Sequence, residues 1–181
     1  MSGAAILEGP WPADLWELEA RLPRKHGEPV TARDGETLLL DSVGRSNWPS
    51  AARELLARGV DIHCRTSGGS TPLHEAAWHG NVECLLLLLE HGANIEAQSH
   101  TGRTALHNAV LSYNTSCVRL LVERGANLAA VDNEGISSLA LAQAHMPEAD
   151  EDDDDSLKKA QALTTIMNSS PHSRPAKTHV R

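Results

Sequence analysis

The sequence predicts an all-α solenoid, in which short helix-turn-helix units stack in a row and are joined by hairpin-like loops. Two glycine series run through the chain in register, each with a spacing of 33 residues. They are Gly69, Gly102 and Gly135, and Gly59, Gly92 and Gly125. The segments that follow these glycines also repeat, because GSTPLHEAA at residues 69–77 is matched by GRTALHNA at residues 102–109. A fixed period of this size is typical of solenoids built from one supersecondary unit.

The first helix of each unit is expected to begin at a threonine. Thr71 and Thr104 suit an N-cap, where the hydroxyl satisfies an N–H group that has no partner within the helix. Pro72 then lies in the first turn, where its missing N–H has no cost. Gly80 can adopt the left-handed conformation that ends a helix.

The second helix is predicted from about Asn81 to His91, and it stops at Gly92. An extended link at residues 93–99 then leads into a glycine-containing turn at residues 99–102. The unit is therefore a helix, a tight turn, a second helix and a hairpin-like loop.

The TPLH motif at residues 71–74, the glycine that follows at position 80 and the LLxxGAN pattern at residues 88–94 resemble the ankyrin repeat family. The resemblance covers about residues 32–168 and implies an ankyrin-repeat solenoid of about four repeats. The expected parts are an N-terminal capping helix and linker (1–31), repeat 1 (32–65, degenerate), repeat 2 (66–98), repeat 3 (99–131), repeat 4 (132–168, degenerate) and a disordered tail (169–181).

Repeat 1 departs from the pattern, as a terminal repeat with one side toward solvent can. Residues 34–38 open it, and because Thr37 and Thr71 are 34 residues apart, one residue is inserted near Asn47. Before it, residues 12–22 have an apolar stripe at helical spacing. This helix either covers the open side of repeat 1 or detaches to bind a partner.

An acidic insertion at residues 147–155 divides repeat 4. The helices on either side of it are predicted at residues 137–145 and 156–168. Ser156 suits the N-cap of the second helix, and the preceding aspartates favour its positive end. The apolar face of that helix is expected to consist of Leu157, Ala160, Leu163 and Ile166 or Met167.

Tyr113 interrupts repeat 3 at the position equivalent to Gly80. A tyrosine does not adopt the left-handed conformation cheaply, whereas asparagine tolerates it better. We therefore expect the turn to shift by one residue, to Asn114. Tyr113 is then either part of a locally different loop or an aromatic contact at the mouth of the groove.

The charge of the chain is concentrated in one segment. The chain has 24 acidic and 16 basic residues and a formal net charge of −8, but seven of the acids lie within residues 148–155. The nearly neutral remainder argues against a nucleic-acid binder with a basic face and against an electrostatic membrane anchor. The longest aliphatic run, Leu85–Leu89, is far shorter than the roughly 20 residues of a membrane span. With no secretory signal pattern and three cysteines without a CxxC pair, the expected location is the cytoplasm, the nucleus or both.

No pattern predicts catalytic residues, a metal site or a cofactor, so we expect the chain not to be an enzyme. Its ten histidines include no HExxH motif. His74 and His107 occupy the TPLH position, where the resemblance implies structural hydrogen bonds between neighbouring turns. Cys84 and Cys117 share a second-helix position and are expected to fill the core as small apolar groups. The acidic run lacks the alternation of an EF-hand loop.

The resemblance implies a non-enzymatic interaction module that binds a protein partner along its concave side, through hairpin tips and first helices. Trp78 is the leading contact residue, because a large aromatic with one N–H donor is a common interface anchor. Its alternative role is packing between repeats. Mapping by repeat position gives the contact candidates Ser67, Gly68, Ser70, Trp78, His79, His100, Thr101, Arg103, Leu111, Ser112, Tyr113, Asn133, Glu134 and Ile136.

Two further hypotheses concern the partner. In the first, an acidic loop docks a basic partner with an affinity that falls steeply with salt. Its residues are Asp150, Glu151, Asp152, Asp153, Asp154 and Asp155. In the second, the chain is a regulatory subunit or substrate adaptor of an enzyme such as a phosphatase or a ubiquitin ligase. In each case we expect a monomer that binds neither nucleic acid directly nor a membrane.

Overall fold

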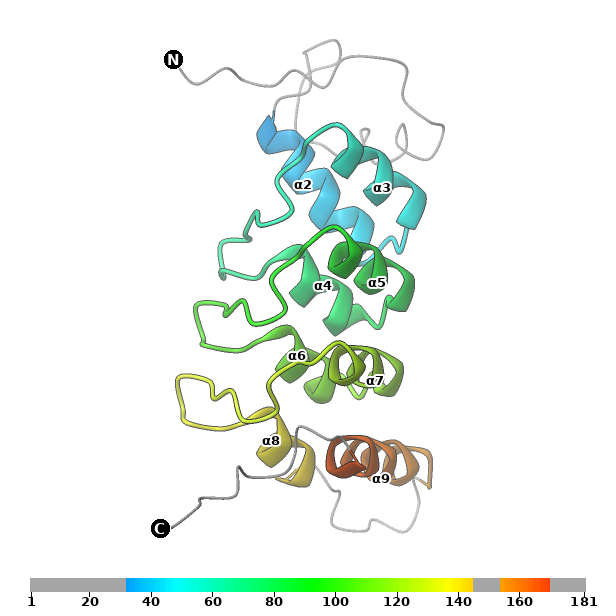
Figure 1. The fold of residues 1–181 in the computed structure, drawn as a ribbon, viewed down its shortest axis with the longest axis vertical. Coiled ribbons are helices and arrows are strands. Elements are labelled where there is room, and N and C mark those ends of the chain that lie inside the picture. The colour runs from blue at the N-terminus through cyan, green and yellow to red at the C-terminus, as the bar shows by residue number, and fades with distance from the viewer. Residues whose placement is uncertain (1–31, 145–153, 170–181) are drawn as a thin grey trace, which may run out of the picture.

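The structure is a computed structural model that describes residues 32–144 and 154–169. Its helices form two layers of a single stack, with hairpin loops projecting from the side of the inner layer (Figure 1). The inner layer consists of α2 (Ala32–Val43), α4 (Pro72–His79), α6 (Ala105–Leu111) and α8 (Ser138–Ala144). The outer layer consists of α3 (Pro49–Ala57), α5 (Val82–Glu90), α7 (Thr115–Glu123) and α9 (Asp154–Ser169). The predicted all-α solenoid is confirmed.

The local signals around α4 act as the sequence predicts. Thr71 is the N-cap residue, and its N–H donates to Nδ1 of His74 at 3.2 Å, which is one half of a reciprocal capping box. Pro72 occupies the first turn. Gly80 ends the helix with a φ of 76°, and its N–H donates to the Ala76 carbonyl. The short length of α4 therefore follows from signals at both of its ends.

The core runs through the whole stack and is built mainly from leucine, alanine, valine and cysteine. Leu73, Ala76 and Leu85 are buried in repeat 2, and Cys84 and Cys117 are fully buried at equivalent positions of α5 and α7. Small side chains let neighbouring helices approach closely, and each fully buried leucine contributes about 1.5–3 kcal/mol. This explains how a chain with one tyrosine and no phenylalanine still fills its core.

Repeat 1 differs from the prediction at its start. The helix α2 already begins at Ala32, so residues 34–37 are helical and Thr37 is not an N-cap. A helix at this place satisfies its own backbone groups without a bond to another hairpin. The predicted insertion lies in the loop at residues 44–48, where Asn47 has a φ of 47°. The equivalent loop of repeat 2 spans only residues 80–81.

The predicted shift of the turn from Tyr113 to Asn114 is wrong. Tyr113 itself takes the left-handed conformation, with a φ of 56°. Asn114 keeps a φ of −83° as the N-cap residue of α7, and its side chain donates to the carbonyls of Ala77 and Trp78 in the preceding repeat. Those two bonds hold Asn114 in place, so the strain falls on Tyr113, whose ring packs partly against the core.

Repeat 4 follows the prediction apart from the ends of its helices, because α8 is shorter than expected and α9 is longer. Ser137 precedes α8, and its hydroxyl oxygen accepts the N–H of Ala140 at 3.1 Å, as a capping residue does. The helix α9 begins at Asp154, not Ser156, so Asp154 and Asp155 belong to the helix and the predicted cap at Ser156 is wrong. Acidic residues are favourable in the first turn of a helix, which accounts for the earlier start.

Part of the predicted apolar face of α9 is confirmed. Leu163 and Met167 are buried and Ile166 is partly buried. The side chains of Leu157 and Ala160 lie outside what the structure describes, as does the predicted N-terminal helix at residues 12–22. The tail predicted at residues 169–181 also lies outside it, apart from Ser169, which is the last residue of α9 and not part of a disordered tail.

Candidate interaction surface

In the described part of the chain three hairpins project from the inner layer, and two backbone hydrogen bonds hold each of them. We call them hairpin 2 (residues 66–70), hairpin 3 (residues 99–103) and hairpin 4 (residues 132–136). The N–H of their first residue donates to the carbonyl of their last at 2.9, 2.9 and 3.0 Å, respectively. The glycine of each hairpin makes the second bond, to the carbonyl of the first residue. In hairpin 3 this is Gly102, whose φ is 78° and whose N–H donates to the Ser99 carbonyl at 3.0 Å.

Adjacent hairpins are joined through their backbones. The N–H of His100 donates to the Gly68 carbonyl at 3.1 Å, and the N–H of Asn133 donates to the Thr101 carbonyl at 3.0 Å. A Cβ atom on Gly69 would lie 2.7 Å from the backbone nitrogen of His100. Glycine is therefore needed at this position both for its positive φ and for the close approach of the next hairpin.

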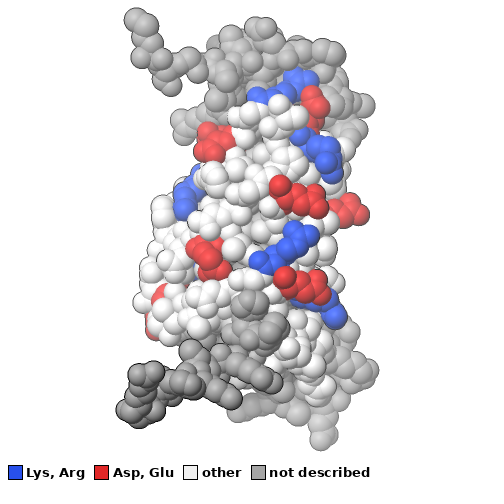
Figure 2. All heavy atoms as spheres, viewed as in Figure 1, with Lys and Arg blue, Asp and Glu red and all other residues white. Residues whose placement is uncertain are grey.

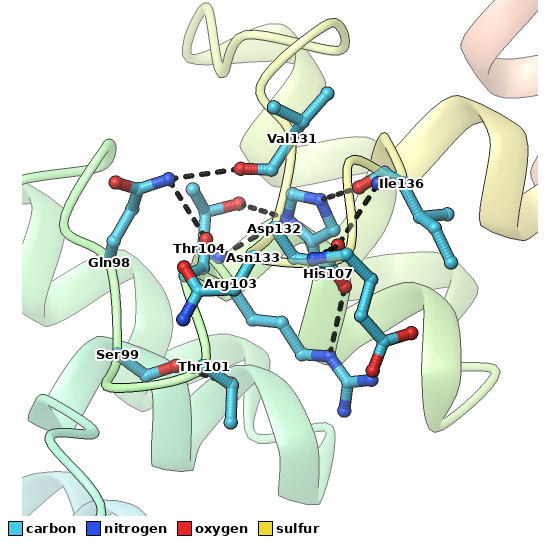
Figure 3. A network of polar contacts seen from close by, with 12 residues as sticks. Gln98, Ser99, Thr101, Arg103, Thr104, His107, Val131, Asp132, Asn133 and Ile136 are labelled. Carbon is cyan, nitrogen blue, oxygen red and sulfur yellow. Dashed lines mark hydrogen bonds and ion pairs between the residues drawn. The ribbon is translucent and has the colours of Figure 1, made fainter.

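A ladder of side-chain hydrogen bonds runs along the bases of the hairpins. Arg65 donates from Nη1 to the carbonyls of Gly69 and Gln98, both at 2.7 Å. Gln98, 33 residues later, donates from Nε2 to the carbonyls of Gly102 (2.9 Å) and Val131 (3.1 Å) (Figure 3). Val131 is the next equivalent residue and has no donor group, and it is 48% exposed. The ladder therefore ends at repeat 4.

His74 and His107 join each inner helix to the following hairpin. In both, Nδ1 accepts the N–H of the preceding N-cap threonine, at 3.2 and 3.1 Å, so the ring proton must lie on Nε2. His74 Nε2 then donates to the Arg103 carbonyl at 2.8 Å, and His107 Nε2 donates to the Ile136 carbonyl at 3.2 Å. The structural role implied by the resemblance is confirmed.

Burial sets the protonation state of these two imidazoles. Both side chains are fully buried, and desolvation lowers the pKa of His74 and of His107 below 6.5, although the carbonyl that each ring bonds opposes the shift. The neutral form that burial favours is also the form that the two hydrogen bonds require.

Asn81 and Asn114 make a second set of contacts between repeats, which the sequence analysis missed. Asn81 donates from Nδ2 to the carbonyls of Val43 (2.8 Å) and Gly44 at the end of α2. Asn114 repeats this contact at the end of α4, at 3.0 and 2.9 Å. Each asparagine thus supplies donors to helix-end carbonyls of the repeat before it. Their 33-residue spacing was the available signal.

Asp132 anchors hairpin 4. Its Oδ1 accepts the N–H groups of Glu134 and Ile136, both at 3.0 Å, and its Oδ2 lies 3.5 Å from Nε of Arg103 (Figure 3). Burial alone would raise the pKa of Asp132, but the two N–H donors and the Arg103 side chain together lower it. The carboxylate is therefore charged, and it links hairpin 4 to hairpin 3.

The inner helices expose one side. The helix α4 packs against α2, α6 and α5, so its exposed residues face the remaining side, away from the outer layer, where the hairpins project (Figure 1). We call this side, together with hairpins 2 to 4, the hairpin face. Trp78 is 47% exposed on it, and neighbouring His79 is also exposed.

The predicted contact residues differ in exposure. The exposed ones are Ser67, Gly68, Trp78, His79, His100, Thr101, Asn133 and Glu134, and the partly buried ones are Ser70, Arg103, Leu111, Ser112, Tyr113 and Ile136. Leu111 and Tyr113 pack partly against the core. The Ser112 hydroxyl donates to the Asn108 carbonyl at 2.8 Å and so already has a partner within the solenoid. Among the described residues, the hairpin tips and Trp78 are thus the most accessible of the set.

Comparison with protein families agrees with this arrangement. Residues 40–89 and residues 79–122 each match a family model described as ankyrin repeats. The chain is an ankyrin-repeat protein. Ankyrin repeats are in general protein–protein interaction modules. A search of curated proteins finds no match to this ankyrin-repeat protein.

The charges on the ankyrin solenoid are mixed. Figure 2 shows acidic and basic side chains interspersed on one face, with no broad area of either sign. Net charge therefore does not single out a partner class for the repeats. The predicted acidic loop lies outside the described residues, apart from its last two aspartates in α9, and its docking of a basic partner stays a prediction.

The cysteines of the ankyrin solenoid belong to its core. Cys64, Cys84 and Cys117 are all free and buried, and burial raises their pKa values to about 12, 12 and 11. Within residues 32–144 and 154–169, no group of three His, Cys, Asp or Glu side chains is arranged to hold a metal ion. No helix in that part of the chain is both long enough and apolar enough to cross a bilayer.

Proposed function

We propose that this ankyrin-repeat protein is a non-enzymatic module that binds a protein partner on its hairpin face. The observation that supports this most is Trp78, a large aromatic that is 47% exposed on a face whose hairpins are joined by backbone hydrogen bonds. Exposed tryptophans are enriched among the residues that dominate interface energies, and losing one often costs about 2 kcal/mol or more.

The hairpins suit such a role because their shape is fixed before binding. The carbonyls of Gly68 and Thr101 are used between hairpins, while the side chains of His100 and Thr101 at the tips are exposed. A partner therefore meets side chains on a preorganised backbone, which lowers the entropy cost of binding.

A binding role fits better than catalysis because the reactive residue types serve the fold. His74 and His107 use both ring nitrogens in hydrogen bonds within the solenoid. Burial keeps Cys84 in its thiol form, with a pKa of about 12, and a thiol is a poor nucleophile. We place the protein in a reducing compartment, cytosol or nucleus, and its three free cysteines support this.

The test is affinity purification with quantitative mass spectrometry, using the full chain and two variants. Trp78→Ala removes the exposed aromatic, and Arg119→Ala changes an exposed residue of α7 on the outer layer as the matched control. We expect partners that are lost with Trp78→Ala and kept with Arg119→Ala, while the melting temperatures of all three proteins agree. An identical set of partners with both variants would contradict binding through the hairpin face.

A further inference from the structure

We propose that residues 177–181 of this chain lie along the exposed edge of hairpin 4, as each hairpin of the stack lies along the one before it. The contact that defines this arrangement is a hydrogen bond from the N–H of His179 to the carbonyl of Glu134. The inference does not depend on the proposed function, because it concerns a contact within one chain.

The edge of hairpin 4 lacks the backbone bond that the two earlier hairpins make. The Gly68 carbonyl of hairpin 2 accepts the N–H of His100, and the Thr101 carbonyl of hairpin 3 accepts the N–H of Asn133. The next residue in this series of 33 is Glu134, and among the described residues no group donates to its carbonyl. Because the three hairpins are held by the same bonds, this carbonyl has the position of an acceptor for one more segment.

The surface beside this carbonyl is also uncovered. Gly69 and Gly102 are buried, because the backbone of the next hairpin lies only 2.7 and 2.6 Å from the place of their missing Cβ atoms. Gly135 is exposed, and a Cβ built on it meets none of the described residues within 4 Å. Val131 is 48% exposed at the base of the same hairpin. We call the strip formed by Val131, Glu134 and Gly135 the open edge, which is the last in the row of hairpins (Figure 1).

The repeat period shows how a chain reaches such an edge from the outer layer. The helix α5 ends at Glu90, and ten residues later His100 bonds the hairpin of its own preceding repeat. The helix α7 ends at Glu123, and ten residues later Asn133 does the same. A link of ten residues therefore takes the chain from the end of an outer helix to the edge of the hairpin before it.

The same count from α9 gives His179. The helix α9 ends at Ser169, two residues after buried Met167, just as α7 ends two residues after buried Leu121, so the two ends are equivalent. Pro171 cannot adopt the positive φ of the glycine at its place in repeats 2 and 3, so the link takes another path. Ten extended residues span about 33 Å, which exceeds the reach of those earlier links because they contain turns. The β-branched residues on both sides of His179 favour an extended backbone.

Charge also favours this segment as the occupant of the open edge. Residues 126–144 contain two acids, Asp132 and Glu134, and no lysine or arginine. Arg103 already pairs with Asp132, whereas Glu134 is exposed and has no ion pair with another described residue. Residues 170–181 contain three basic residues and no acid. The segment therefore complements the charge of the edge, and the charges assist the backbone bond.

The test is nuclear magnetic resonance on the full chain with a nitroxide attached at Val180→Cys. The native cysteines are buried in the described fold, so the label reacts with the new one. We expect the amide signals of residues 133–135 to be lost while those of hairpin 2 remain. The signals should return when His179→Pro removes the donor, and they should stay lost with Ala176→Pro, which changes the same segment at another N–H. They should also return with Glu134→Lys and stay lost with Glu83→Lys, which reverses an exposed acid on α5.

Three results would overturn the inference. The first is broadening that is equal in hairpins 2 to 4 or strongest at the outer helices, and the second is broadening of hairpin 4 that survives His179→Pro. The third comes from mixing an isotope-labelled chain without nitroxide with an unlabelled nitroxide chain, because loss of the hairpin 4 signals there would put the segment of a second copy on the edge. Each of these results leaves the proposed binding of a partner through the hairpin face standing.

Discussion

Removing the side-chain amide of Asn81, which joins repeat 2 to repeat 1, should lower the stability of the N-terminal end of the solenoid. Several of the last carbonyls of α2 accept backbone N–H groups from the loop that follows it; the Ser42 carbonyl, for example, accepts the N–H of Trp48 at 2.8 Å. The Val43 carbonyl instead accepts the side-chain amide of Asn81 in the next repeat. Asn81 caps α5 without a side-chain cap bond, so Asn81→Ala removes the contact between repeats and no helix cap.

The cost can be worked from these contacts. Asn81 is 8% exposed and Val43 is fully buried, so after the substitution water cannot easily replace the lost donor. A buried carbonyl left without a partner costs about 1–3 kcal/mol, which gives a destabilisation of about 2 kcal/mol for Asn81→Ala. In a stack whose repeats contact only their neighbours, most of this falls on repeat 1.

The assay is native-state hydrogen exchange combined with urea unfolding. We expect amides of α2 and α3 to exchange about 30-fold faster in Asn81→Ala, while amides of α6 and α7 change little. The control is Asn94→Ala, because Asn94 is exposed and its side-chain oxygen accepts the N–H of nearby Glu96. A loss of stability below about 0.5 kcal/mol, or equal acceleration along the whole stack, would refute the reasoning.

Three other predictions follow from single residues. Because burial holds the pKa values of His74 and His107 below 6.5, the unfolded chain binds more protons than the folded chain below about pH 6.5. The free energy of unfolding should therefore decrease as the pH is lowered, and an unchanged melting midpoint between pH 7.5 and pH 5 would contradict this. In urea unfolding, Gly69→Ala should cost clearly more stability than the roughly 1 kcal/mol expected for Gly92→Ala. Both glycines have a positive φ, but only at Gly69 would the added Cβ clash with the backbone of the next hairpin. Equal costs would argue against this close packing of the hairpins. The Cys84 thiol should react with a disulfide reagent at pH 8 only as fast as the protein unfolds, and rapid labelling of the native chain would show that it is accessible.

Much of the fold could be predicted because its signals are local. The threonine cap, the proline and Gly80 act within one helix, and all three behave as expected in α4. The start of repeat 1 could not be predicted, because the glycine at position 35 reads locally as a turn signal, whereas it lies inside a helix that begins at Ala32. Tyr113 was misjudged for a related reason: its steric cost is visible in the sequence, but the two cross-repeat bonds of Asn114 that outweigh it are not.

The candidate surface was predictable in outline and not in detail. Mapping by repeat position placed Trp78 on an exposed side of the solenoid. It also gave Ser112 as a contact candidate, although the Ser112 hydroxyl already donates to a carbonyl within the solenoid. Arg65 and Gln98 are 33 residues apart in the sequence, but equal spacing of unlike polar residues does not reveal that both bond the next hairpin. Contacts between repeats need coordinates, because each joins residues about one period apart.

Binding through the hairpin face is tested most directly by hydrogen exchange of the full chain with and without a partner identified by affinity purification. The account predicts slower exchange in hairpins 2 to 4 and at the end of α4, with α3, α5 and α7 unchanged. Protection confined to the outer helices, with the amides around Trp78 unaffected, would contradict it.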